Sequence, residues 1–195
     1  MSISFQQIHQ ISIDAAWYTQ PFKGFCLDSR KLEAGQIFIA LNSYSQPEKT
    51  RLFAENALNA GALAVISETD LGLANEWVCP EVRYLMGEWQ KQYLQVVDPV
   101  TALRGIAVTG TNGKTTISRL IAELISSQRQ GCAVMGTTGN GILPNLTPST
   151  HTTLDALQLQ NALHDYAKQG ASFVALEASS HGLEQGRLNG CEIEI

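Results

Sequence analysis

The stretch GIAVTGTNGKTTISRL combines the groups that bind phosphate in proteins. A phosphate loop needs backbone N–H groups that converge on one anion, glycines that let the main chain approach, a cation, and a hydroxyl for a metal ion. Gly110, Gly113, Lys114 and Thr115 supply these groups between an apolar run and an amphipathic segment. The usual spacing would place the first glycine at Val108, so the stretch predicts a contracted phosphate loop rather than a glycine-rich turn with a surface lysine.

A second polar stretch, FVALEASSHGLEQGRL, follows an apolar run that reads as a buried strand. The carboxyl ends of parallel strands meet at one edge of a sheet, so Glu177 is expected beside the phosphate loop. Together with the Thr115 hydroxyl, its carboxylate could hold Mg²⁺ against phosphate oxygens. Arg187 could grip a phosphate or carboxylate with two hydrogen bonds.

Nucleophilic and thiol chemistry are less well supported. Ser179, Ser180 and His181 contain the residue types of a hydrolase, but no G-x-S-x-G elbow surrounds the serines. The four cysteines are far apart and have no zinc-ligand spacing, which indicates small core residues in a reducing cytoplasm.

Composition narrows the class of protein further. The chain has 195 residues, 44% of them hydrophobic, and a formal net charge of −5, with 13 basic and 18 acidic residues. This charge disfavours nucleic acid or an anionic membrane as a partner. No apolar run approaches the roughly 20 residues that cross a bilayer, so we expect a cytoplasmic protein.

In the first half, strand-like and helix-like runs alternate. FCLDS, IFIAL and ALAVIS predict strands, and VRYLM predicts one more. TRLFAENALNAG predicts a helix with Leu52, Phe53, Ala57 and Leu58 near one face and Gly61 as its stop, and GEWQKQYLQVV predicts a second helix. We therefore expect an α/β domain over residues 1–98.

From Gly105 the pattern restarts, which predicts a second domain over residues 99–195. A strand, the phosphate loop and a helix are followed by a strand in CAVM, a helix in LDALQLQNALHDYAKQG and a strand in FVALE. The first helix carries its apolar residues on one face: Ile117, Leu120, Ile121, Leu124 and Ile125. Residues 136–152 are rich in Gly, Pro and Thr and predict a functional loop. Because a doubly wound sheet seldom ends after so few strands, we expect the chain to be part of a longer protein.

Four ordered motifs, GTNGKTT, GTTGNG, THTT and LEASSHGLEQGRL, together with LDSRKLEAGQIFIAL in the first half, resemble the Mur ligases of peptidoglycan synthesis. The likeness is greatest to the members that add the third amino acid. It implies an N-terminal uridine-nucleotide domain followed by the first part of a P-loop-like, mostly parallel-sheet ATP-binding domain. It also implies a cytoplasmic, monomeric enzyme of cell wall biogenesis that takes part in cell shape and cell division.

The resemblance implies an ATP-dependent, ADP-forming amide ligase. Such an enzyme joins meso-diaminopimelate to UDP-N-acetylmuramoyl-L-alanyl-D-glutamate through an acyl phosphate, with Mg²⁺ as cofactor. The implied catalytic residues are Lys114 and Glu177, and the implied metal ligands are Thr115 and Glu177. The implied ATP loop comprises Gly110, Thr111, Asn112, Gly113, Lys114, Thr115 and Thr116. The implied substrate contacts are Leu27, Ser29, Tyr44, Ser45 and Gln46 at the uridine end, and Thr152, Thr153, Ser179, Gln185 and Arg187 at the muramoyl-peptide end.

The sequence departs from the family pattern at two places. The loop after IFIAL reads NSYSQPEKTRL where relatives tend towards Asp-Gly, and His151 stands where close relatives often carry Asn. An imidazole still donates one hydrogen bond, so His151 remains a candidate substrate contact.

Relatives also continue with a further metal-binding lysine and a C-terminal domain that selects the amino acid. Without these parts we expect the 195 residues alone to be unable to complete the ligation. Three alternatives stay open: a lysine-adding sister ligase, a relative of folylpolyglutamate synthase, which is not expected to carry the uridine segment, and a stand-alone module that binds a UDP-sugar or ATP.

Overall fold

The computed structural model describes residues 3–9, 13–43, 46–149 and 152–194. The chain divides into two compact units, Met1–Asp98 and Pro99–Ile195. Each unit has its own sheet and its own buried core. Within the described part of the chain, no helix is both long and apolar enough to cross a bilayer.

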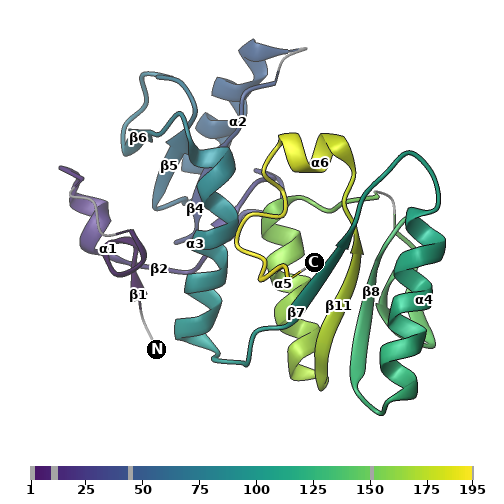
Figure 1. The fold of residues 1–195 in the computed structure, drawn as a ribbon. Coiled ribbons are helices and arrows are strands. Elements are labelled where there is room, and N and C mark those ends of the chain that lie inside the picture. Colours follow the sequence, from purple (N-terminus) through teal and green to yellow (C-terminus); the bar gives the residue numbers. More distant parts are fainter. Residues whose placement is uncertain (1–2, 10–12, 44–45, 150–151, 195) are drawn as a thin grey trace. The chain divides into compact units, whose positions relative to one another are not determined.

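The first unit contains a four-stranded parallel sheet with the strand order β3–β4–β5–β6 (Figure 1). All residues of β4 and β5 are buried, as expected for continuous apolar runs in a parallel sheet. The sheet consists of β3 (Phe25–Cys26), β4 (Ile37–Ala40), β5 (Ala64–Ser67) and β6 (Glu76–Val78). The other elements are β1 (Ile3–Ser4), α1 (Phe5–Ile8), a 3-10 helix (Ala16–Thr19), β2 (Pro21–Phe22), α2 (Pro47–Asn59) and α3 (Val82–Val97).

Helix α2 begins at a proline and is followed by Gly61, whose φ of 97° is the left-handed conformation that glycine readily adopts at a helix end. The predicted helix and its stop are therefore confirmed. The predicted buried face is only partly right. Ala54 and Ala57 are fully buried, whereas Leu52 and Phe53 are about half exposed.

The prediction of a strand at VRYLM was wrong, because these residues form the first turns of α3. Val82, Met86 and Trp89 are all buried, and their spacing of four and three residues is that of one helical face. The strand lies just before, at β6. A five-residue apolar run does not distinguish the two structures by itself, and here the continuing helical period decides.

An aromatic cluster forms the core between α1, β6 and α3. The ring of Phe5 lies 5.1 Å from that of Trp89 and 6.0 Å from that of Trp77. The His9 imidazole packs 5.0 Å from Trp77 and 5.2 Å from Trp89. Its Nε2 has no hydrogen-bond partner among the described residues, and burial lowers the pKa of His9 below its ordinary 6.5.

The second unit contains a five-stranded mixed sheet in the order β10–β9–β8–β11–β7. The strands β8, β11 and β7 are parallel to one another, and β9 and β10 extend the sheet antiparallel. The strands are β7 (Arg104–Val108), β8 (Gly131–Gly136), β9 (Gly139–Ile142), β10 (Asn145–Thr147) and β11 (Ala171–Glu177). The helices are α4 (Lys114–Ser127), α5 (Ala156–Lys168) and α6 (Ser180–Glu184).

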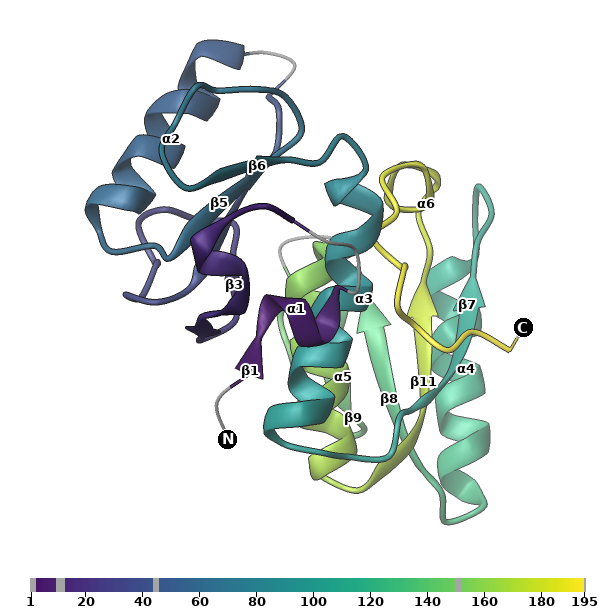
Figure 2. The same ribbon diagram turned by 90° about the vertical axis from the view of Figure 1, so that its left-hand side faces the viewer.

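Helices α4 and α5 cover opposite faces of this sheet (Figures 1 and 2). Alternate residues of β8 explain the two layers, because successive side chains of a strand point to opposite faces. Cys132 and Val134 pack with Ala122 of α4, whereas Ala133 and Met135 pack with Leu159 of α5. The expected α/β class with mostly parallel sheets is confirmed.

The predicted apolar face of α4 is only partly right: of its five residues, Ile121 and Ile125 pack against the core between α4 and the sheet. Ser118 and Ala122 are fully buried against the sheet. Ile117, Leu120 and Leu124 are 48%, 57% and 67% exposed. The two fully buried positions carry small residues, which let the helix approach the strands closely.

Residues 136–152 are not only a loop. Strands β9 and β10 form an antiparallel hairpin in this segment, with Ile142 opposite Asn145 and Asn140 opposite Thr147. Gly139 and Gly141 have φ values of 130° and 155°, and a β-carbon at Gly139 would lie 2.7 Å from a backbone oxygen. The glycines that suggested a loop are thus sites of close strand approach.

Candidate nucleotide and metal site

Three strand ends converge at one edge of the second sheet. In β7 and β11, Val108 lies opposite Glu177, and β8 ends alongside them at Gly136. The phosphate-loop motif follows β7, and all three parallel strands run toward this edge (Figure 1). The crevice outside the carboxyl ends of the strands is where ligands bind in open α/β sheets.

The loop after β7 has the geometry of an anion cradle. Gly110 and Gly113 have φ values of 138° and 82°, which a residue with a β-carbon rarely adopts. Gly113 is the N-cap of α4, so the first backbone N–H groups of this 14-residue helix face the loop without intrahelical partners. The Nζ of Lys114 donates a hydrogen bond of 2.7 Å to the carbonyl of Gly110.

A pocket of about 340 Å³ lies beside this loop. It brings together most of the predicted ATP residues, both predicted metal ligands and two predicted substrate contacts. Its lining consists of Thr111, Asn112, Gly113, Lys114, Thr115, Thr137, Thr152, Glu177 and Ser179. Of these, only Thr137 was not predicted.

Glu177 is buried, with 2% of its surface exposed, and both oxygens of its carboxylate accept hydrogen bonds. Oε1 accepts the backbone N–H of Thr137 at 2.9 Å, and Oε2 accepts its hydroxyl at 3.1 Å. A carboxylate has about four lone-pair positions, so these bonds leave acceptor capacity for a cation. Thr137 follows β8, and the same rule that placed Glu177 at this edge would have found it.

The predicted muramoyl-side residues form a hydrogen-bonded group around the end of β11. The hydroxyl of Thr153 donates to the backbone carbonyl of Glu177 at 3.1 Å and lies 3.1 Å from the hydroxyl of Ser179. Arg187 donates to the carbonyl of Thr153 at 2.8 Å, and its other nitrogens donate to the amide oxygen of Gln185 at 2.7 and 2.9 Å. The structure thus brings these four residues together.

Ser179 is the N-cap of α6, and its hydroxyl accepts the N–H of Gly182 at 3.0 Å. The exposed His181 ring contacts the Gln185 amide at 2.8 Å and a carboxylate oxygen of Glu184 at 3.8 Å. These contacts are those of a helix cap and a surface histidine. They give no support to a hydrolase site, in agreement with the sequence analysis.

The remaining candidates are distributed as follows. Thr116 is exposed in the first turn of α4. In the first unit, Leu27 lines a pocket of about 190 Å³ together with Phe53 and residues of β4. Ser29 is half-buried, and Gln46 is exposed at the N-cap of α2. Tyr44, Ser45 and His151 lie outside the described residues.

Next to Ser29, the Asp28 carboxylate pairs with Arg30 at 2.8 Å. The hydrogen bonds from Arg30 lower the pKa of Asp28 to about 2.

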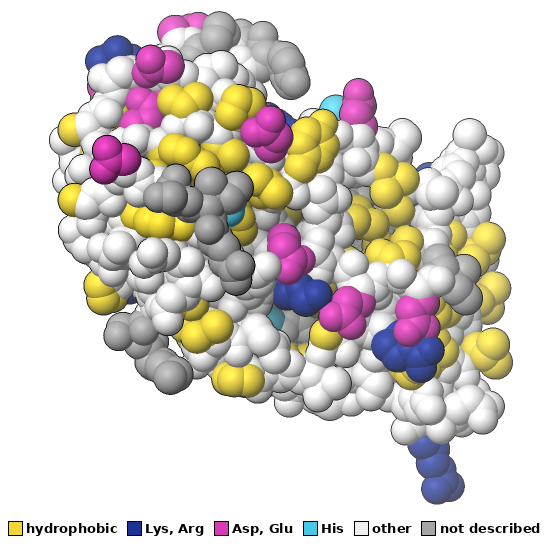
Figure 3. Space-filling view, turned by 60° about the vertical axis from the view of Figure 1, so that its left-hand side comes forward, with side chains coloured by type: hydrophobic (Ala, Val, Ile, Leu, Met, Phe, Trp, Pro, Cys, Tyr) yellow, Lys and Arg dark blue, Asp and Glu magenta, His cyan; other side chains and the backbone are white. Residues whose placement is uncertain are grey.

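Several arginines form ion pairs with carboxylates of their own unit. On the face drawn in Figure 3, acidic and basic side chains are scattered. The pairs are Arg30–Asp28, Arg51–Glu55, Arg83–Glu68, Arg104–Glu194 and Arg119–Glu123. The Lys114 contact with Gly110 is different, because a carbonyl carries no net charge. This contact leaves the positive charge of Lys114 available to an anion.

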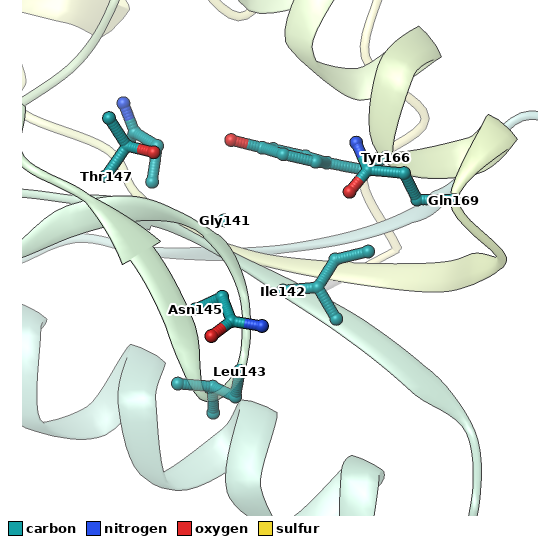
Figure 4. Close-up of a pocket in the computed structure, with 8 residues that line it drawn as sticks. Gly141, Ile142, Leu143, Asn145, Thr147, Tyr166 and Gln169 are labelled. Carbon is teal, nitrogen blue, oxygen red and sulfur yellow. The ribbon is translucent and has the colours of Figure 1, made fainter.

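A second pocket of the same unit, of about 470 Å³, lies between the β9–β10 hairpin and α5. Figure 4 shows the Tyr166 side chain reaching from α5 with its hydroxyl directed toward Thr147. Burial raises the pKa of Tyr166 above 10.0, so its hydroxyl is protonated at neutral pH. None of the predicted site residues that the structure describes lines this pocket.

The donor set at the strand edge fits a hard divalent cation that also contacts phosphate. Among the described residues, no three His, Cys, Asp or Glu side chains gather into a metal cluster. The pocket instead offers the Glu177 carboxylate and the Thr115 side chain beside an anion cradle. Mg²⁺ typically binds through one or two carboxylates plus substrate phosphates, so these residues fit it.

Comparison with known proteins agrees with this geometry. Residues 108–195 match the Mur ligase middle domain. The chain is 41% identical over 181 residues to the UDP-N-acetylmuramoyl-L-alanyl-D-glutamate–2,6-diaminopimelate ligase of Ralstonia nicotianae, covering 86% of this chain and 34% of that protein. It is 41% identical over 172 residues to the Vibrio cholerae ligase of the same name, covering 83% and 34%. The chain thus spans about a third of the length of these relatives.

Solved structures are similar as well. A structure of UDP-N-acetylmuramoyl-L-alanyl-D-glutamate–2,6-diaminopimelate ligase matches with a TM-score of 0.96 and 80% identity, covering 100% of this chain and 39% of that one. The MurF ligase of Thermotoga maritima, in complex with ADP, matches at 20% identity with a TM-score of 0.52, over 81% of this chain and 32% of that one. The second similarity is one of fold.

Proposed function

The chain belongs to the Mur ligase family, as its sequence motifs predicted, and from this premise we propose that it forms part of an ATP-dependent amide ligase. The ligase would add meso-diaminopimelate to UDP-N-acetylmuramoyl-L-alanyl-D-glutamate. The names of the similar proteins favour diaminopimelate over lysine. The observation that carries the proposal is the anion cradle beside a buried, hydrogen-bonded carboxylate at one sheet edge.

In the second unit, Gly110–Thr116 would bind the ATP phosphates. Backbone N–H groups and the Lys114 ammonium would neutralise the triphosphate. Thr115 and Glu177 would hold Mg²⁺, which would stabilise charge on the transferred phosphoryl group when bound. Lys114 would keep its position by exchanging the Gly110 carbonyl for a phosphate oxygen.

The substrate carboxylate would attack the γ-phosphorus of ATP, giving an acyl phosphate and ADP. The amino group of the second substrate would attack the acyl carbon, lose a proton and expel phosphate as the amide forms. The residues of this chain would act by positioning and by charge neutralisation. Thr152, Ser179, Gln185 and Arg187 would orient the muramoyl-peptide end.

Thr153 would act differently from these residues. Its side chain is buried and bonded to the end of β11, and its carbonyl accepts from Arg187. We therefore propose that Thr153 fixes the loop that carries Thr152, here called the substrate loop, rather than contacting substrate through its hydroxyl.

The first unit would bind the uridine end of the nucleotide sugar. Leu27 borders an apolar pocket large enough for part of a small ring, and the half-buried Ser29 follows it. We propose that Leu27 packs against the uracil and Ser29 hydrogen-bonds to it. Gln46, Tyr44, Ser45 and His151 remain proposed contacts that rest on the family resemblance.

Titration of the chain with ADP and Mg²⁺ in a calorimeter tests the nucleotide site. Lys114→Ala removes a charged hydrogen-bond donor and should weaken binding by ~1.5–3 kcal/mol. Lys49→Ala, at an exposed lysine of α2, is the matched control and should leave binding unchanged. Equal affinities of the Lys114 variant and the unaltered chain would contradict the proposed cradle.

The substrate site is tested separately with UDP-N-acetylmuramoyl-L-alanyl-D-glutamate as the titrant. Ser29→Ala should lower the affinity for this ligand and for UDP alone, whereas Arg187→Ala should lower only the affinity for the complete nucleotide sugar. If neither variant changes either affinity, the assignment of these residues is wrong.

A further inference from the structure

We propose that Thr137 is a positioning residue: its hydroxyl and N–H aim the Glu177 carboxylate at the metal and link that carboxylate to the substrate loop through Thr152. The inference rests on the proposed function, since it takes Glu177 as a metal ligand. Thr137 lies outside the phosphate loop and outside the segment that carries Glu177. It belongs to the turn between β8 and β9.

Both Glu177 oxygens are held by this one residue. The backbone N–H of Thr137 fixes Oε1 at 2.9 Å and its hydroxyl fixes Oε2 at 3.1 Å. Two bonds from one residue to the two oxygens of a carboxylate restrict rotation about its last torsion. A buried side chain with a fixed terminal plane presents its remaining lone pairs in a defined direction.

Gly136, the last residue of β8, also determines where the Glu177 carboxylate can lie. A β-carbon at Gly136 would lie 2.5 Å from the carboxyl carbon of Glu177, which is closer than atoms can approach. Gly136 therefore gives the side chain the space to lie flat against the end of β8. Two consecutive residues thus position the Glu177 carboxylate: Gly136 leaves space for it, and Thr137 donates hydrogen bonds to it.

The Thr137 hydroxyl also lies 3.3 Å from the hydroxyl of Thr152. In both contacts the Thr137 hydroxyl is the donor, and a hydroxyl carries a single proton. Thr152 and Glu177 therefore compete for that proton. A ligand that engages Thr152 would release the Thr137 hydroxyl to Glu177 and so alter the support of the carboxylate.

The test uses the 195-residue chain with ADP present and Mn²⁺ as a paramagnetic substitute for Mg²⁺, its binding followed by electron paramagnetic resonance. Thr137→Val keeps the shape and the backbone N–H but removes the hydroxyl. Loss of a partner of a metal-binding side chain weakens metal binding by roughly tenfold or more. We expect a loss of this size for Thr137→Val and near-complete recovery in Thr137→Ser.

Two controls separate positioning from a general loss of structure. Thr138→Val makes the same change at the next, exposed residue of the turn and should not alter Mn²⁺ affinity. Affinity for ADP without metal should be the same in Thr137→Val and the unaltered chain, because the phosphate loop is untouched.

A double-mutant comparison decides whether Thr137 acts through Glu177. Glu177→Gln should weaken Mn²⁺ binding, and Thr137→Val should have no further effect in that background. If Glu177→Gln leaves Mn²⁺ affinity unchanged, the proposed metal site itself fails. If Glu177→Gln weakens binding but Thr137→Val does not, or if the two losses simply multiply, only the positioning role of Thr137 is overturned.

Discussion

Replacing Gly136 with alanine should destabilise the second unit through one identified clash. The added β-carbon would lie 2.5 Å from the carboxyl carbon of Glu177, whose side chain is 2% exposed and therefore has little room to move. Gly136 does not have a left-handed backbone conformation, so the cost is steric and not torsional. Inserting one carbon into a packed site typically costs ~1–3 kcal/mol. We expect a loss of this size in the free energy of unfolding, measured by urea denaturation with far-ultraviolet circular dichroism.

The double variant provides the control. Glu177→Ala removes the carboxylate that occupies the space, so adding Gly136→Ala in that background should cost close to nothing. The coupling energy of the pair should therefore be about as large as the cost of Gly136→Ala alone. Equal costs of Gly136→Ala in both backgrounds would refute the argument, because they would mean that the new methyl group collides with something other than Glu177.

Three further outcomes follow from the packing and the shifted pKa values. Burial lowers the pKa of His9 below 6.5, so stability should fall as pH drops from about 6.5 toward the folded-state pKa, by at most about 1.4 kcal/mol per pH unit, and His9→Phe should flatten this decline in urea titrations at several pH values. The pairing with Arg30 lowers the pKa of Asp28 from 3.8 to about 2, so its contribution is present above 3.8 and lost as pH falls toward 2; because Arg30 is 86% exposed, Asp28→Asn should cost less than ~1 kcal/mol at neutral pH in the same assay. Leu176→Ala, at a buried position near the carboxyl end of β11, should cost ~2–5 kcal/mol, and a loss below ~1 kcal/mol would contradict the assigned core.

The grouping of the candidate site residues at one sheet edge was the most predictable part of the molecule. The sequence predicts a phosphate loop from Gly110, Gly113 and Lys114, because few other functions require that combination between a strand and a helix. Glu177 followed from the rule that parallel strands end at one edge, and the structure brings it into the same pocket as Lys114. Thr137 was missed because the strand-end rule was applied only to the charged residue: Thr137 also follows a strand that ends at this edge, but a threonine carries no charge that marks it as a ligand. Its importance depends on a residue forty positions away.

The secondary structure around the site was harder to predict. At VRYLM the residue types favour a strand, and only the burial of Val82, Met86 and Trp89 on one face decides for a helix. The α4 face shows a similar limit. Large apolar residues suggested the buried side, and Ile121 and Ile125 do pack there. The fully buried positions are nevertheless Ser118 and Ala122, because close packing against the strands favours small side chains.

The aromatic cluster has an optical consequence. All three tryptophans of the sequence, at positions 17, 77 and 89, belong to the first unit, and the second unit has none. The Trp77 and Trp89 rings are 6.0 Å apart, close enough for their excited states to couple and to give a strong near-ultraviolet dichroism signal. Tryptophan fluorescence therefore reports on the first unit alone, since the second unit contributes no tryptophan emission. A single tryptophan introduced at Phe173, in β11 of the second sheet, would add a separate reporter for the half that carries the proposed nucleotide site.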